Sequence, residues 1–143
     1  MTQDFHKFWL KITAVVVASF APVMFIGSIE AASWPMQFTL DLLSLPLDGL
    51  PVYGDSASRF ISAILGGILL GWGATIWMLQ AWVYDAAPEG VRRTVVTALL
   101  CWFVLDSAGS VLSGHASNAL FNVGILALAV GPMWRPATAA SVS

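Results

Sequence analysis

Charged side chains are scarce in this chain of 143 residues, of which only 10% are Asp, Glu, Lys or Arg while 58% are hydrophobic. A water-soluble domain carries about 25% charged residues, so the composition excludes an ordinary soluble protein and indicates a membrane class. The formal net charge of −2 argues against a nucleic-acid partner, because such a partner requires a basic face; we expect none.

Cysteine occurs once, at position 101. A single cysteine cannot form an internal disulfide, and no cationic residue lies nearby in the sequence to activate the thiol. Because Cys101 lies in an apolar run, we expect it to act as a small hydrophobic side chain.

Long apolar runs, in contrast, are abundant. A helix needs roughly 20 predominantly apolar residues to cross a bilayer core about 30 Å thick. Four segments meet this requirement: residues 9–29, 60–84, 94–112 and 117–134. The sequence predicts an all-α fold with one domain, residues 1–143, built as an integral membrane bundle of four transmembrane helices. The last three spans have short links, so we expect them to pack as successive antiparallel hairpins.

The first span has some features of a secretory signal peptide, because Lys7 and Lys11 precede it and Glu30 is followed by two alanines. Its apolar run is longer than a signal sequence requires, and Pro22 lies inside it. We therefore expect a retained helix that bends at Pro22, where neighbouring helices satisfy the freed carbonyl.

Basic residues are unevenly distributed along the chain. If the N-terminus is cytoplasmic, five of the six Lys and Arg residues lie on the inner side: Lys7, Lys11, Arg92, Arg93 and Arg135. Only Arg59 lies outside. The positive-inside rule thus predicts a multi-pass protein of the bacterial inner (cytoplasmic) membrane, with both termini in the cytoplasm and the lipid bilayer around its spans.

Residues 30–59 form the long outer segment between the first two spans. Met36, Leu40, Leu43 and Leu47 recur there at helical spacing with polar residues between them, and Pro35 suits a first helical turn. This pattern predicts a short amphipathic helix on the outer surface. The helix serves either as a lid or docking surface, or only as a cover for the outer ends of the spans.

The second span carries a stripe of small residues at intervals of four: Ala63, Gly67, Gly71 and Thr75. Small side chains allow another helix to approach closely, so the stripe predicts a helix-packing face. The partner helix can belong to this chain or to another one.

Residues 104–122 combine a membrane span with many polar side chains. Asp106 is energetically unfavourable there, because inserting a charged Asp at the bilayer centre costs about 2.5–3.5 kcal/mol of free energy. Candidate partners lie on its own helical face, in the following loop and on the next, antiparallel span. The predicted cluster consists of Asp106, Ser110, Ser113, His115, Asn118 and Asn122. It is either a ligand- or proton-responsive site, or a set of interhelical hydrogen bonds that sets the helix register.

Catalytic and cofactor sites have little support. His6 and His115 lie on opposite sides of the membrane in the predicted topology, so they cannot share a metal. The serines, Asp106 and His115 are spaced along one helix and its following loop, without the strained turn that exposes a nucleophile. We therefore expect no metal, no cofactor and no enzymatic activity.

Four stretches between residues 39 and 136 carry a resemblance: TLDLLSLPLDG, GGILLGWG, EGVRRTVVTALLCWFVLDSAGS and SNALFNVGILALAVGP. They resemble an uncharacterised family of small proteobacterial four-helix integral membrane proteins, which is loosely DoxX-like in size and layout. The resemblance implies the four-helix architecture and does not point to any particular activity.

Three functions fit these observations. The first is a non-enzymatic accessory or structural subunit that packs against a larger respiratory or photosynthetic membrane complex, or against further copies of itself, through the small-residue stripe. The second is a small-solute or proton-coupled carrier, or a binder of a lipophilic ligand, that uses the cluster around Asp106. The third is a membrane enzyme that acts on a lipid or quinone through Asp106 and His115.

Overall fold

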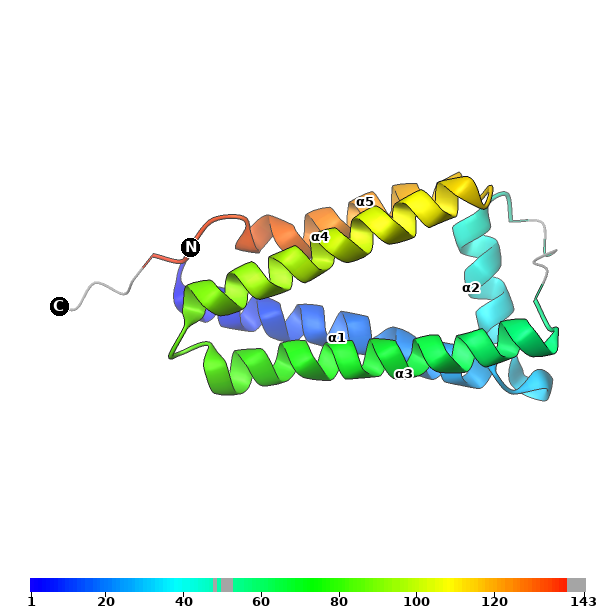
Figure 1. Ribbon diagram of the computed structural model, residues 1–143, viewed down its shortest axis with the longest axis horizontal. Coiled ribbons are helices and arrows are strands. Elements are labelled where there is room, and N and C mark those ends of the chain that lie inside the picture. Colours follow the sequence, from blue (N-terminus) through cyan, green and yellow to red (C-terminus); the bar gives the residue numbers. More distant parts are fainter. Residues whose placement is uncertain (48, 50–52, 139–143) are drawn as a thin grey trace.

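A computed structural model describes residues 1–47, 49 and 53–138 of the chain. The described residues form five α-helices, as expected for an all-α fold (Figure 1). The helices are α1 (Gln3–Gly27), α2 (Trp34–Ser44), α3 (Ser56–Met78), α4 (Pro88–Leu112) and α5 (Ala116–Val130). Three short elements accompany them, a 3-10 turn at Glu30–Ala32, a π-turn at Leu79–Val83 that extends α3, and a 3-10 turn at Gly131–Met133. The predicted amphipathic helix within residues 30–59 is thus present as α2.

Local chemistry places the helix ends. The Thr2 hydroxyl accepts a hydrogen bond from the backbone N–H of Phe5 at the start of α1 (3.3 Å), and the Asp55 carboxylate accepts from Ala57 and Ser58 at the start of α3 (2.8 and 3.0 Å). Pro88 is the first residue of α4, a position where its missing N–H has no cost. Each of the four long helices therefore begins before the apolar span that the sequence predicted for it.

The four long helices pack as two pairs. α1 runs along α3, and α4 runs along α5. Glycine permits the first contact, because a Cβ at Gly73 would lie 2.7 Å from the Ala14 carbonyl oxygen and one at Gly66 would lie 3.2 Å from that of Ala21. The expected hairpin between residues 60–84 and 94–112 is packed only near its turn, because α3 packs along most of its length against α1 and not against α4.

The buried core lies at the end of the molecule that contains Met1 and Thr138, which we call the termini end. Its largest apolar members are Leu10, Ile76, Val95, Leu99 and Met133. Near the middle of the helices, the rings of Trp72 and Trp102 join the two pairs, with centroids 6.2 Å apart. Beyond this contact the pairs diverge toward α2 (Figure 1).

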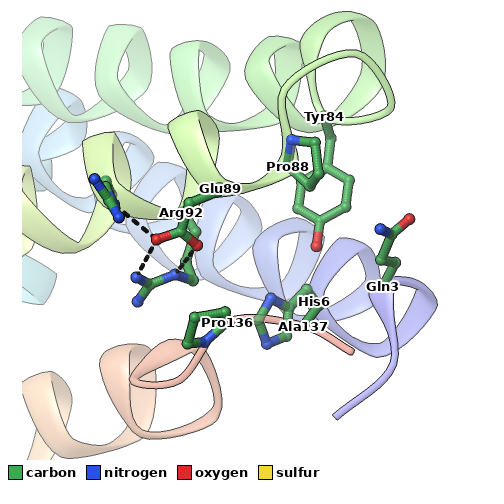
Figure 2. Close-up of a pocket in the computed structure, with 9 residues that line it drawn as sticks. Gln3, His6, Tyr84, Pro88, Glu89, Arg92, Pro136 and Ala137 are labelled. Carbon is green, nitrogen blue, oxygen red and sulfur yellow. Dashed lines mark hydrogen bonds and ion pairs between the residues drawn. The ribbon is translucent and has the colours of Figure 1, made fainter. Parts of the chain in front are cut away.

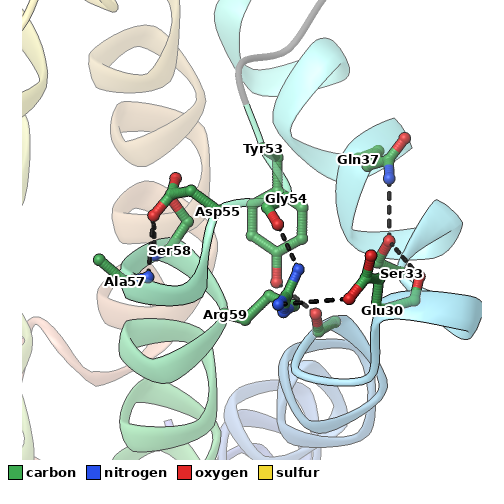
Figure 3. A network of polar contacts seen from close by, with 10 residues as sticks. Glu30, Ser33, Gln37, Tyr53, Gly54, Asp55, Ala57, Ser58 and Arg59 are labelled. Atoms are coloured by element: carbon green, nitrogen blue, oxygen red, sulfur yellow. Dashed lines mark hydrogen bonds and ion pairs between the residues drawn. The ribbon is translucent and has the colours of Figure 1, made fainter.

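α2 bridges the diverging pairs at the opposite end of the molecule, the α2 end (Figure 1). Its buried Met36 packs against Gly27 of α1, and at its other end the Ser117 hydroxyl of α5 donates a hydrogen bond to the Leu43 carbonyl oxygen (2.6 Å). Figure 3 shows the polar contacts beside the first attachment, where Arg59 pairs with Glu30 at 3.4 Å. The Tyr53 hydroxyl also donates to the Gly27 carbonyl oxygen at 2.5 Å.

Four helical stretches are long and apolar enough to cross a membrane: Gln3–Gly27, Ser56–Val83, Pro88–Leu112 and Ala116–Met133. Only 17–28% of the most apolar window in each stretch is buried inside the molecule. Large apolar side chains such as Leu105, Leu112, Leu120 and Leu128 point outward. This surface suits a multi-pass membrane protein, because hydrocarbon can cover side chains that water would expel.

Candidate functional site

The polar residues of α4 and α5 meet at the α2 end. The Asn122 side-chain amide, which is 2% exposed, donates a hydrogen bond to Asp106 Oδ2 at 2.9 Å and a longer one to Ser107 Oγ at 3.3 Å. Asp106 is half-buried. Its other oxygen, Oδ1, has no hydrogen bond or ion pair within the part of the chain that the structure describes. One acceptor atom of the carboxylate therefore stays available.

A second hydrogen bond joins the two helices one turn further on. The Asn118 amide donates to Ser110 Oγ (2.8 Å), and this hydroxyl donates in turn to the Asp106 backbone carbonyl (2.7 Å). Ser113 Oγ donates to the Ser110 carbonyl oxygen (3.1 Å). The two asparagines thus attach α5 to α4 over two successive turns. The contact that includes the Asp106 side chain is the one further from the loop between the helices.

The sequence brings these residues together through helical periodicity and one tight loop. Asp106, Ser110 and Ser113 are spaced by four and three residues, so they share one face of α4. Further back on this face lie Leu99 and Val95, which belong to the core. The face that bears Asp106 is therefore the one that turns inward. Gly114 then reverses the chain with a φ of 88°, a conformation that favours glycine.

A cleft of about 740 Å³ opens beside the carboxylate, between α2 and the ends of α4 and α5. Both apolar and polar side chains line it: Leu40, Leu43 and Pro46 come from the α2 side, and Leu105, Asp106, Ser110 and Asn118 from α4 and α5. Asp41 adds a second carboxylate, and His115 stands at the loop. The described part of the lining contains no Lys or Arg, so its electrostatic potential favours positive charge.

The structure brings all six predicted cluster residues to this region, although in different roles. Asp106, Ser110 and Asn118 both line the cleft and belong to the hydrogen-bond network, and Asn122 supports Asp106 from behind. Ser113 and His115 line the cleft near its loop, and the His115 side chain is exposed without a hydrogen bond in the described residues. A catalytic Ser–His contact is not formed there, since the Ser113 hydroxyl donates to a backbone carbonyl.

The predicted packing face on α3 lies outside the contacts within the chain. Ala63, Gly67, Gly71 and Thr75 are all exposed, and a Cβ at Gly67 or Gly71 would meet nothing within 4 Å. α1 instead packs on the neighbouring stripe, which contains the buried residues Ser62, Gly66, Gly73 and Ile76. Within the described residues, no helix packs on the predicted face.

Sequence reasoning missed three contributors to the site. Ser107 accepts from Asn122, Ser117 ties α5 to α2, and Asp41 lines the cleft. The polar positions of the amphipathic pattern could have indicated Asp41, because that side of α2 must face either water or a polar surface. Nothing in the sequence indicates that Ser117 reaches a backbone carbonyl 74 residues away.

Comparison of this chain with protein-family models, with characterised proteins and with solved structures yields no significant match.

Proposed function

We propose that the chain is a non-enzymatic integral membrane protein that binds a small lipophilic ligand with a positively charged or hydrogen-bond-donating group in the cleft beside Asp106. One observation carries the proposal: among the described residues, Asp106 Oδ1 has no partner, and the cleft of about 740 Å³ that it faces is lined by no Lys or Arg. Its neighbours in the protein supply an amide hydrogen bond but no cation. A ligand cation would compensate the remaining charge.

The apolar part of the lining supports a ligand with hydrocarbon character. Leu40, Leu43, Pro46 and Leu105 flank the polar groups, and sites of this kind bind the body of a ligand by burial while a few polar groups orient it. The surrounding helices are suited to lipid. A ligand that partitions into the bilayer would reach such a cleft at high local concentration.

The proposed location is the bacterial inner membrane with the α2 end outside. Lys7, Arg92, Arg93 and Arg135 lie toward the termini end, whereas Asp41 belongs to the α2 end. The positive-inside rule then places both termini in the cytoplasm and opens the cleft toward the outer leaflet.

Binding of tetraphenylphosphonium, a lipophilic cation, to the protein purified in a neutral detergent tests the proposal. We expect saturable binding by the wild type, and loss of binding in Asp106→Asn, which keeps the shape of the side chain but removes its charge. Asp85→Asn is the control, because Asp85 is exposed at the termini end and paired with Lys7 at 2.6 Å. Equal binding by the wild type and Asp106→Asn would refute the proposal.

A second function, an accessory subunit of a larger membrane assembly, is favoured by the exposed stripe on α3. Gly67 and Gly71 have open space beside them, although α3 already packs against α1 through two other glycines, Gly66 and Gly73. An assembly through this stripe, with other subunits or as a homo-oligomer, would fill that space. We expect Gly71→Leu to dissociate such an assembly in native mass spectrometry while the fold stays intact; a wild type that is monomeric after gentle extraction would count against it.

A further inference from the structure

A second cavity lies at the termini end, far from the cleft beside Asp106, and it does not depend on the proposed function. Its volume is about 270 Å³. The side chains that decide its chemistry come from three parts of the chain: His6 of α1, Tyr84 after the π-turn, and Glu89 of α4 (Figure 2). Pro136 and Ala137, which follow the last helical turn, also line the cavity.

Two buried polar atoms at this cavity have no partner. His6 and Tyr84 are each only 1% exposed, and neither His6 Nε2 nor the Tyr84 hydroxyl makes a hydrogen bond within the described residues. In Figure 2 the Tyr84 hydroxyl points toward the His6 ring, and the Gln3 amide lies to one side. Buried polar groups are nearly always hydrogen-bonded, so two unpartnered atoms on residues that line one cavity indicate a ligand.

The Glu89 carboxylate and the Arg92 guanidinium beside the cavity are already engaged in hydrogen bonds within the protein. Glu89 accepts two hydrogen bonds from Arg92 and one from Arg93, all at 2.7 Å. Arg92 also donates to the carbonyl oxygens of Met133 and Trp134 (2.9 and 3.1 Å). The groups that remain for a ligand are an imidazole, a phenol and an amide, which are neutral hydrogen-bonding groups. Because Arg92 uses its donors within the protein, the groups left for a ligand are uncharged, and they favour a neutral hydrogen-bonding ligand.

We propose that this cavity binds the neutral, oxygen-bearing headgroup of a quinone-type lipid. Pro88, Pro136 and Ala137 provide apolar walls for a ring, and 270 Å³ accommodates a headgroup but not a whole lipid. Imidazole, phenol and amide can each donate or accept a hydrogen bond, and together they suit carbonyl oxygens as well as hydroxyls. The wide exposure of apolar surface on the neighbouring helices places the isoprenoid tail in the bilayer.

The test is a titration of the purified 143-residue chain with decylubiquinone in neutral detergent. Quenching of tryptophan fluorescence measures the binding. Tyr84→Phe removes only the unpartnered hydroxyl. We expect it to weaken binding about three- to tenfold, the effect of one neutral hydrogen bond, while the melting temperature without ligand is unchanged or higher. The matched control is Tyr53→Phe, because the Tyr53 hydroxyl already donates to Gly27 at the opposite end; this variant should bind as the wild type.

Gln3→Ala, at the start of α1, supplies a second variant that should also weaken binding. Monoolein and phosphatidylglycerol serve as competitors in the same micelles. Saturable quenching that depends on Tyr84 and resists phosphatidylglycerol supports the proposal. Quenching without saturation, equal affinity for Tyr84→Phe and the wild type, or displacement of decylubiquinone by an equimolar amount of phosphatidylglycerol or of monoolein overturns it.

Discussion

At the scale of single residues, α3 shows how two glycines two positions apart can have unrelated roles. Gly73 faces α1, where its missing side chain lets the Ala14 carbonyl and the Ala18 methyl group approach within 2.7–2.8 Å of the place a Cβ would occupy. Gly71 faces outward and has nothing within 4 Å of that place. One glycine is thus a requirement of the fold, and the other is not.

Gly73→Ala should lower the free energy of unfolding by about 1–3 kcal/mol, because the added methyl group must push α1 away. Gly71→Ala should leave it unchanged or raise it by up to about 1 kcal/mol, since alanine favours a helix over glycine. Thermal and denaturant unfolding of the detergent-solubilised variants compares the two. Equal destabilisation would mean that α1 does not pack on the Gly73 stripe.

The contact between Asn122 and Asp106 permits a double-mutant test. Asn122→Leu removes the donor to Asp106 Oδ2 and should cost about 1–2 kcal/mol of stability. Asp106→Leu combined with Asn122→Leu should cost less than the two single changes added together, because the pair is then removed as a unit. Strict additivity in an unfolding assay would show that these two side chains are not coupled.

At the scale of the elements, helix starts depend on individual capping groups, and α3 depends on Asp55. The Ser58 hydroxyl and backbone N–H, followed by the Ala57 N–H, hold the pKa of the Asp55 carboxyl below its usual value of 3.8. Because the pKa is depressed in the folded state, the carboxylate contributes stability above its usual pKa. This contribution disappears as the pH falls through the lowered folded value.

We therefore expect the melting temperature of the wild type to fall when the pH is lowered from 5 toward 3, with a part of this fall due to Asp55. The variant Asp55→Asn can still cap the helix through its amide oxygen but cannot titrate, so its melting temperature should depend less on pH in that range. Parallel melting curves of the two proteins measure the difference. Identical pH profiles would assign the acid sensitivity to other carboxylates.

The elements were more predictable from the sequence than their partners were. Hydrophobic length indicated four spans, and the spacing of Met36, Leu40 and Leu43 indicated α2, because both signals are local. The choice of Gly66 and Gly73 over Gly67 and Gly71 as the face for α1 was not predictable, since both stripes have helical spacing. The cavity at His6 and Tyr84 also depends on residues 78 positions apart, which no local pattern relates.

At the scale of the whole molecule, Met1 and Thr138, the ends of the described chain, lie together at one end and α2 lies at the other (Figure 1). A contact joins the two ends of the described chain, because the Thr138 N–H donates to the Met1 carbonyl oxygen at 2.8 Å. If all four candidate helices span a membrane, the two ends of the described chain lie on the same side of it. The arrangement therefore makes one prediction for both ends of the chain at once.

A Cys101→Ser background with a single new cysteine tests this orientation. In intact cells, a membrane-impermeant maleimide should label Leu47→Cys, which lies just after α2, and should not label Gln3→Cys until the membrane is permeabilised. Labelling of both positions in intact cells, or the reverse pattern, would contradict the proposed topology.

The attachment of α2 at both of its ends has a mechanical consequence. One end of α2 packs against Gly27 of α1, and the other end is hydrogen-bonded to Ser117 of α5. This short helix therefore links the α1–α3 pair to the α4–α5 pair, which meet again at Trp72 and Trp102. A ligand between the two helix pairs cannot push them apart without straining the contacts at the two ends of α2. A shorter α2, or weaker contacts at its ends, must change the angle between the pairs. The width of the opening is in this way set by a segment outside the four long helices.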